Sequence, residues 1–326
     1  MLEQRSALQT MRINLIQEMN MNKHALIISA IGFLLFFTGL VSAFLGPVEV
    51  YCYYMFSEGG RFHYDGFGMG SLMFGNITMQ IWGYYLIAFI FIPLGIGHLK
   101  KQAWIQKISL TLLYVWLIVG LPILPIILMI IIVNKEPSLT AIISYMTFAL
   151  AAYTILTPLL IKFYKSNKVK ATLNIQNQKY LHLMNYPLQL MIINLLCIFY
   201  IFTFHGLLLF RGIFPFFGHW LIGLKGIMIV SSSILVFMIT IIGTISRKMW
   251  SWWTALIYFS FLMLSSIITF MISNFSTVVE LLQLPKLETQ ALSNIPLSGF
   301  HLSCILGIPM IISLIVIISS KKFYFT

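Results

Sequence analysis

The sequence predicts an all-α protein, a polytopic membrane helix bundle with about eight transmembrane helices. The chain has 326 residues, of which 60% are apolar and only 9% are charged, and its mean hydropathy is +0.94. A soluble domain carries about 25% charged residues, so this chain has too little charge to cover a surface that faces water. Two further observations support this class: the apolar residues form long uncharged runs, and the basic residues collect in alternate connecting segments.

A helix needs about 20 predominantly apolar residues to cross a bilayer. Eight runs meet this requirement without containing Asp, Glu, Lys or Arg: 25–45, 78–97, 108–133, 138–161, 188–208, 226–245, 252–273 and 299–320. Within the first run, Val41-Ser42-Ala43 has the small residues of a signal-peptidase site. Because that run is long enough to span a bilayer, we expect it to be retained as a helix.

The charged residues predict the orientation of these spans. With eight spans, fifteen basic and two acidic residues fall on the side of both termini, whereas five basic and six acidic residues fall on the other. Since Lys and Arg concentrate in cytoplasmic loops, we expect a cell-membrane protein with both termini in the cytoplasm. Basic clusters beside membrane helices attract anionic headgroups, so we expect membrane lipids as partners and no nucleic acid.

The chain also shows signs of an internal repeat. Gly97, Lys101 and Trp104 follow the second span, and Gly243, Arg247 and Trp250 follow the sixth span with the same spacing. The chain then divides into a cytoplasmic tail (1–24), a four-helix half (25–161), a cytoplasmic linker (162–187), a second four-helix half (188–320) and a short tail (321–326). Such parallel four-plus-four repeats occur in transporters. Because basic residues and Trp are favoured at any cytoplasmic boundary, unrelated helix ends are the alternative explanation.

Two prolines interrupt the third span. Pro122 and Pro125 each remove a backbone hydrogen bond from a helix that is unusually long. They predict either an irregularity in helix packing or a broken helix that lines a cavity.

Residues with varied chemistry collect on the predicted outer side. The spans contain no Asp, Glu, Lys or Arg, and their histidines are His205 and His301, near the outer ends of their helices. The absence of carboxylates and basic groups at membrane depth counts against an ion-coupled carrier. His beside carboxylates is the usual material of acid–base chemistry. The candidate catalytic residues are Glu58, Arg61, His63, Asp65 and His219. The alternative is that these groups pair with one another and solvate the loops. Their spacing matches no metal motif, so we expect no metal site, and the sequence assigns no cofactor.

Two other outer features lead to expectations. The stretch FPFFGHWL, residues 214–221, predicts an aromatic belt at the outer interface or, alternatively, a short re-entrant or interfacial helix. Cys52 and Cys304 both fall near the outer face, where a disulfide can form in an oxidising compartment.

The uncharged spans and the repeat pattern favour a protein of transport or lipid-handling type, or the membrane subunit of a larger complex with protein partners. An integral membrane enzyme with an outer His, Arg and carboxylate site is one alternative. A structural interaction subunit is another. Convergence of the outer residues in one cleft would favour the enzyme.

Overall fold

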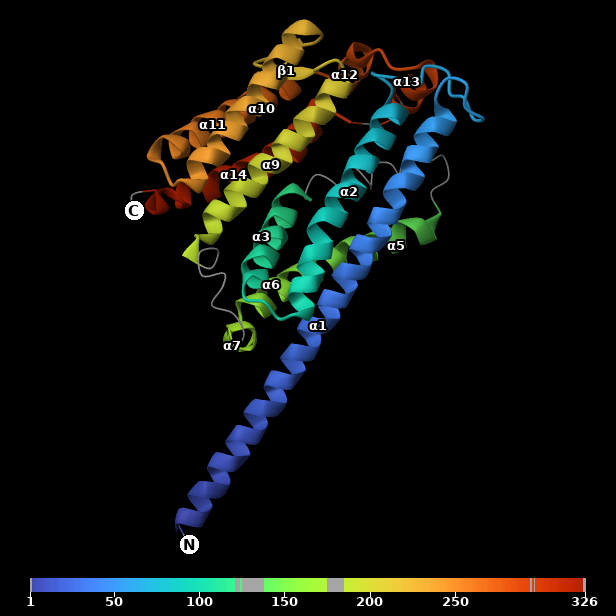
Figure 1. The fold of residues 1–326 in the computed structure, drawn as a ribbon. Coiled ribbons are helices and arrows are strands. Elements are labelled where there is room, and N and C mark those ends of the chain that lie inside the picture. The colour runs from blue at the N-terminus through green and yellow to red at the C-terminus, as the bar shows by residue number, and fades with distance from the viewer. Residues whose placement is uncertain are drawn as a thin grey trace. The chain divides into compact units, whose positions relative to one another are not determined.

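In the computed structural model the chain is an all-α helix bundle, which confirms the predicted fold class. The structure describes residues 2–120, 124, 138–174, 185–293, 295 and 297–324, with side chains from residue 23 onward except at 141, 148 and 150. Within these ranges seven helices are long and apolar enough to cross a membrane, so the protein is multi-pass (Figure 1). Pro122, Pro125 and most of the second half of the third run lie outside the described residues, so the count of eight stays a prediction.

The longer helices cover the apolar runs. The first six are α1 (Leu2–Phe56), α2 (Leu72–Leu99), α3 (Trp104–Val119), α5 (Leu139–Ala149), α6 (Thr157–Lys165) and α7 (Asn167–Asn174), with a π-helical stretch, Leu150–Leu156, joining α5 to α6. The later ones are α9 (Leu188–Leu209), α10 (Leu224–Ile245), α11 (Met249–Ile272), α12 (Phe275–Leu282), α13 (Lys286–Ser293) and α14 (Gly299–Ser319), followed by a short 3-10 helix, Lys321–Phe323. The short helices α7, α12 and α13 lie between the apolar runs.

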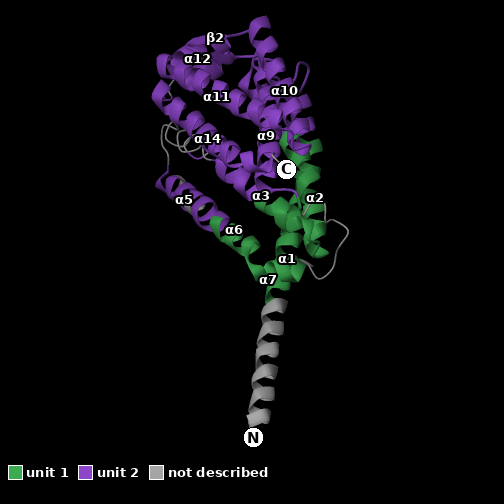
Figure 2. Ribbon diagram, turned by 90° about the vertical axis from the view of Figure 1, so that its left-hand side faces the viewer, with its two compact units in different colours: residues 1–48, 81–110, 158–185 green, residues 49–80, 111–157, 186–326 purple. Residues whose placement is uncertain are grey.

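Contacts divide the chain into two compact units, coloured separately in Figure 2. The first unit comprises Met1–Val48, Ile81–Leu110 and Pro158–Asn185, and the second comprises Glu49–Gln80, Thr111–Thr157 and Tyr186–Thr326. These units are interleaved along the chain, whereas the predicted four-helix halves follow one another. The division into halves therefore stays a prediction.

In the first unit, α1 and α2 approach each other closely at glycines. A Cβ atom on Gly32 would lie 2.6 Å from Cβ of His98, and one on Gly95 would lie 2.5 Å from the backbone nitrogen of Phe36. Small residues allow this approach between membrane helices. The His98 side chain is fully buried and forms a 2.6 Å hydrogen bond between its Nε2 and the hydroxyl of Tyr164.

The segment between the first two apolar runs, residues 46–77, is partly helical. α1 continues through Pro47 to Phe56, and α2 begins at Leu72. The helix therefore includes the aromatic residues after Pro47, and Gly59 and Gly60 come after its end. The loop is therefore confined to residues 57–71.

The turn between α2 and α3 has the same geometry as the turn between α10 and α11. Lys101 and Arg247 adopt left-handed backbone conformations, with φ of 50° and 53°. The amide following each of them donates a 2.9 Å hydrogen bond to the carbonyl of the glycine, Gly97 or Gly243, five residues earlier. Each turn is thus closed by the 6→1 bond of a Schellman motif.

The tryptophans of these turns also occupy equivalent places. A Cβ atom on Gly97 would lie 2.6 Å from the ring of Trp104, and one on Gly243 would lie 2.5 Å from the ring of Trp250. Both indole rings thus pack on a glycine that has no room for a side chain.

A second pair of matching features lies near these turns. Lys162-Phe163-Tyr164 near the end of α6 and Lys322-Phe323-Tyr324 after α14 share a sequence. The hydroxyl of Tyr164 bonds to His98, the residue after Gly97, and the hydroxyl of Tyr324 donates to Oγ1 of Thr244, the residue after Gly243, at 3.3 Å.

In the second unit, α9, α10, α11 and α14 form a four-helix bundle in which α10 packs on α9 and α11, and α14 packs on α11 and α9 (Figure 1). Aromatic rings fill its centre: Tyr200 stacks on Phe237 with centroids 5.7 Å apart, and Phe259 meets Tyr200 edge-on at 5.3 Å. Buried Ser and Thr residues line the helix contacts, as small polar residues do between membrane helices.

The stretch FPFFGHWL forms a β-hairpin, so the alternative prediction of an interfacial helix was wrong. Strands β1 (Phe214–Phe216) and β2 (His219–Leu221) pair antiparallel, and Phe217 and Gly218 between them have φ of 41° and 90°. Helices do not accommodate these positive angles.

Hydroxyl groups of α11 anchor this hairpin. The backbone N–H of Phe217 donates to Oγ of Ser265 at 3.1 Å, and that hydroxyl donates to the carbonyl of Pro215 at 2.7 Å. The N–H of Gly218 donates to Oγ1 of Thr269 at 2.9 Å. Buried backbone groups outside a helix require such partners.

Candidate functional site

The predicted catalytic residues occupy different surfaces of the second unit. Glu58, Arg61, His63 and Asp65 are exposed on the loop 57–71, and His219 is exposed on β2. Nε2 of His63 lies 3.3 Å from Oδ1 of Asp65, and both side chains remain open to solvent. Of the five, Asp65 lines the cavity described next. A catalytic role for the five residues stays a prediction.

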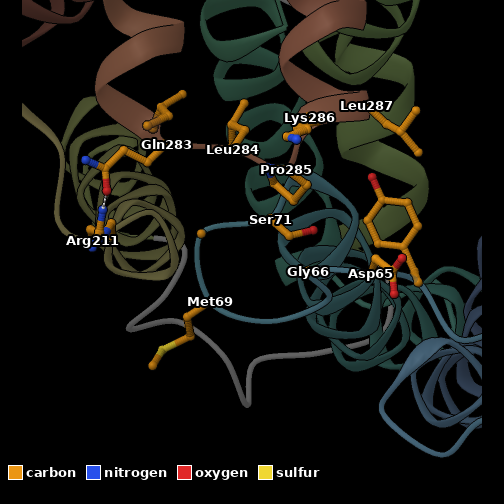
Figure 3. Close-up of a pocket in the computed structure, with 13 residues that line it drawn as sticks. Asp65, Gly66, Met69, Ser71, Arg211, Gln283, Leu284, Pro285, Lys286 and Leu287 are labelled. Carbon is orange, nitrogen blue, oxygen red and sulfur yellow. Dashed lines mark hydrogen bonds between the residues drawn. The ribbon is translucent and has the colours of Figure 1, made fainter.

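A polar cavity of about 650 Å³ lies between the loop 57–71, the end of α9 and the turn that joins α12 to α13 (Figure 3). Its volume falls within the range of small-molecule sites. Its wall consists of Tyr64, Asp65, Gly66, Met69, Gly70, Ser71, Arg211 and residues 282–287. Charged, hydroxyl and backbone groups thus meet in one recess.

Glu288, a buried carboxylate, fixes one side of this recess. Its oxygens accept hydrogen bonds from the hydroxyl of Ser71 at 2.9 Å, the N–H of Leu72 at 2.7 Å and the N–H of Met73 at 3.1 Å. These amides begin α2 and lack partners within the helix. The carboxylate of α13 therefore caps the N-terminus of α2, and the dipole of α2 also favours a negative charge at that end.

Tyr64 adds a fourth contact to this carboxylate. Its hydroxyl hydrogen-bonds to Glu288, and its pKa is raised above the usual value of 10, first by burial and then by the negative charge of Glu288. Tyr64 is therefore neutral at physiological pH and can donate its proton to the carboxylate. This contact ties the loop 57–71 to α13.

Arg211 stands at another part of the wall. It follows α9 with a left-handed φ of 60°, and its guanidinium donates a hydrogen bond to the side-chain oxygen of Gln283. Gln283 is itself left-handed, with φ of 50°, at the end of α12. Lys286, in the first turn of α13, also faces the cavity. Two basic side chains thus line the recess, and both are exposed.

Two glycines bring these elements together. Gly66 has φ of 86°, and a Cβ atom there would lie 3.0 Å from Cγ of Pro285. A Cβ atom on Gly75, in the first turns of α2, would lie 2.5 Å from the ring of Phe210 at the end of α9. The loop 57–71 therefore packs on the α12–α13 turn, and α2 packs on α9, only because side chains are absent there.

A second cavity, of about 340 Å³, lies among α9, α11, α12, α14 and the hairpin. Its wall is almost wholly apolar and aromatic: Leu72, Tyr200, Thr203, Phe204, Leu207, Phe210, Ile213, Phe214, Pro215, Trp220, Leu262, Ser266, Phe270, Val278, Leu282, Leu306 and Met310. Such a lining suits a hydrocarbon chain rather than a polar solute.

The two cavities share part of their walls. Leu282 lines both of them. Ser71 and Arg211 line the polar cavity, while their neighbours in sequence, Leu72 and Phe210, line the apolar one. A polar recess and an apolar recess therefore adjoin at the end of the four-helix bundle.

Several residues in or beside these cavities were not foreseen from the sequence. Glu288 was counted only as an outer charge, and Ser71 and Gln283 carried no motif. The signal available for Glu288 was its place in a short helix that follows Pro285, three residues away, but no sequence rule links it to Leu72, 216 residues distant. Arg211 is one of the five basic residues that the charge pattern places on the outer side.

Other sequence expectations about this region concern metals and thiols. Among the side chains that the structure describes, no three His, Cys, Asp or Glu residues are grouped so that they could hold a metal ion. Cys52, Cys197 and Cys304 are all free thiols. The suggested Cys52–Cys304 disulfide is therefore not present. His301 caps α14 through Ser298, which is a structural role.

No protein-family model, curated protein or solved structure matches this chain. The fold and the two cavities define it as a multi-pass α-helical membrane protein with an amphipathic recess.

Proposed function

We propose that this protein handles lipid: it binds an amphipathic molecule from the membrane, with the hydrocarbon chain in the apolar cavity and the polar end in the polar cavity. The observation that carries this proposal is the shared wall of the two cavities at Leu282. A lipid has the same division into a polar and an apolar part. We propose the outer side of the cell membrane as the location, because the basic residues favour cytoplasmic termini.

The apolar cavity supports lipid binding rather than transport of a polar solute. Its walls are contributed by bundle helices and by a hairpin held on α11 through hydroxyl groups. A pathway for an ion or a polar solute would require polar or ionisable side chains at membrane depth. The hydroxyl groups of this wall belong to Tyr200, Thr203 and Ser266, and the other side chains of the wall are apolar or aromatic.

We further propose the parallel four-plus-four repeat. The support is local: two turns closed by the same backbone bond, two tryptophans on glycines, and two Lys-Phe-Tyr segments whose hydroxyls meet the residue after the glycine. Unrelated helix ends explain the basic residues and the tryptophans, but they do not explain the tyrosine contacts. A repeat of this kind is used by membrane transporters, which is compatible with movement of a bound lipid.

Photo-cross-linking tests lipid binding. The purified protein is reconstituted in phosphatidylcholine vesicles that contain a lipid with a diazirine on its acyl chain, and cross-linked peptides are mapped by mass spectrometry. We expect adducts on peptides from α9, the hairpin and α14. Uniform labelling of all exposed apolar helix faces, with none on residues that line the cavity, would contradict the proposal.

A matched pair of variants on α14 sharpens this test. Leu306 lines the cavity, whereas Ile308, two residues later, is 49% exposed on the helix surface. Leu306→Trp fills the cavity and should remove most of the adducts, while Ile308→Trp should leave them unchanged. Equal labelling of the two variants would count against the apolar cavity as the binding site.

A further inference from the structure

The polar cavity separates positive from negative charge. Figure 3 shows Arg211 and Asp65 on opposite sides of the cavity, with Lys286 between them. Arg211 comes from the end of α9, Lys286 from the start of α13 and Asp65 from the loop 57–71. The recess thus presents two cations and one carboxylate to a ligand.

Each of these groups has the chemistry of a headgroup contact. Guanidinium and ammonium groups bind phosphate oxygens through charge-assisted hydrogen bonds. A carboxylate accepts such bonds from an ammonium group. The hydrogen bond from Arg211 to Gln283 engages one guanidinium nitrogen, Nη1, and the planar fork of arginine carries five N–H donors in total. Donors of Arg211 therefore remain for a ligand.

From this arrangement, we propose that the polar cavity binds a zwitterionic headgroup, with a phosphate against Arg211 and Lys286 and an ammonium group against Asp65. This inference rests on the lipid binding proposed above and specifies the lipid class. A purely anionic headgroup would meet Asp65 as an unfavourable neighbour. A headgroup without charge would leave Arg211 and Lys286 without a matching group.

The location of the cavity supports a lipid rather than a free metabolite. Arg211 and Ser71 are neighbours in sequence of Phe210 and Leu72, which line the apolar cavity. A molecule with its phosphate at Arg211 therefore has an apolar recess beside it for its chains. A phosphorylated solute without chains would leave the apolar cavity empty.

The test compares two lipids that carry the same diazirine-labelled acyl chains. One is phosphatidylethanolamine, which carries a phosphate and an ammonium group, and the other is phosphatidylglycerol, which is anionic. We expect phosphatidylethanolamine to label the protein more strongly at equal concentration. Asp65→Asn should remove this preference. Arg211→Gln should lower labelling by both lipids about tenfold, the size expected when a hydrogen bond between charged groups is lost.

Control variants use charged residues outside the cavity. Lys225→Gln on α10 and Glu280→Gln on α12 remove one positive and one negative charge at exposed positions outside the cavity. Neither variant should change the level of labelling or the preference for phosphatidylethanolamine. Equal or stronger labelling by phosphatidylglycerol, or a preference that persists in Asp65→Asn, would overturn the headgroup assignment. Acyl-chain adducts in the apolar cavity would persist in that case. Loss of those adducts with every lipid would instead overturn the proposed function itself.

Discussion

Replacing Glu288 should release the start of α2 from α13. In the native protein this carboxylate accepts four hydrogen bonds, from the hydroxyls of Ser71 and Tyr64 and from the N–H groups of Leu72 and Met73, and it is 9% exposed. Glu288→Ala removes all four acceptor contacts. Because the site borders the polar cavity, water can reach some of the freed donors and reduce the loss.

The magnitude follows from the number of contacts. Hydrogen bonds to a charged group contribute about 1.5 to 3 kcal/mol each, so the two amide bonds at the lower value amount to about 3 kcal/mol. The lost interaction with the helix dipole adds about 0.5 kcal/mol. Since every 1.4 kcal/mol is a factor of ten, amide opening at Leu72 and Met73 should become up to about three-hundredfold more frequent.

Hydrogen–deuterium exchange of peptides that cover residues 70–80 measures this opening in detergent or nanodiscs. Glu288→Gln keeps one acceptor oxygen without the charge and should give a smaller increase, about tenfold. Glu280→Ala on α12 is the control, because its side chain is exposed. A change of less than about threefold in Glu288→Ala, or an equal change in Glu280→Ala, would refute the argument that the carboxylate holds α2 in place.

The remaining predictions concern the hairpin, the C-terminal segment and the turn between α2 and α3. Ser265→Ala leaves the N–H of Phe217 without its acceptor, so we expect about 1 to 3 kcal/mol of destabilisation and faster amide exchange in the hairpin, with no change in exchange at α2 as the control. Burial raises the pKa of Tyr324 to about 12 from its usual 10. Between pH 10 and 12 the folded state keeps this proton, whereas the unfolded state loses it. The contribution of Tyr324 to stability is therefore unchanged below pH 10 and falls by about 2 kcal/mol between pH 10 and 12. A thermal-unfolding series in which Tyr324→Phe loses as much stability over this pH range as the native protein would disprove this. Gly97→Ala should lower the melting temperature through about 1 to 3 kcal/mol of overpacking against an indole ring, whereas Gly83→Ala, which meets nothing within 4 Å, should not.

The candidate site illustrates what could be foreseen from residues alone. Exposed polar residues in an outer loop were identified, and Asp65 does line a cavity. The structure adds Arg211, Lys286 and Glu288, which come from segments more than 130 residues away from the loop in sequence. These three residues meet the loop 57–71 only because the helix bundle places the end of α9 and the start of α13 beside it. Neither hydropathy nor spacing carries that information, because a pattern along the chain reports only on local periodicity.

The two matching helix ends show the reverse case. Spacing alone identified Gly97, Lys101 and Trp104 with Gly243, Arg247 and Trp250, and both sets adopt the same turn geometry. The two turns match because a helix end is a local structure, which depends on a glycine and on one residue that accepts a left-handed backbone. The matching tyrosines, Tyr164 and Tyr324, required the structure, since their contacts are separated by 66 and 80 residues.

By itself, the sequence determined the class of the protein, the positions of its apolar helices and the absence of acidic and basic residues from the apolar runs. The physical reason is that a bilayer imposes length and hydropathy on each span separately. Only the tertiary structure decided that residues 214–221 form a hairpin on α11, that Glu288 caps α2 and that a polar cavity adjoins an apolar one at Leu282. These features depend on packing between helices, where side-chain shape and hydrogen bonds choose among arrangements that the bilayer permits equally.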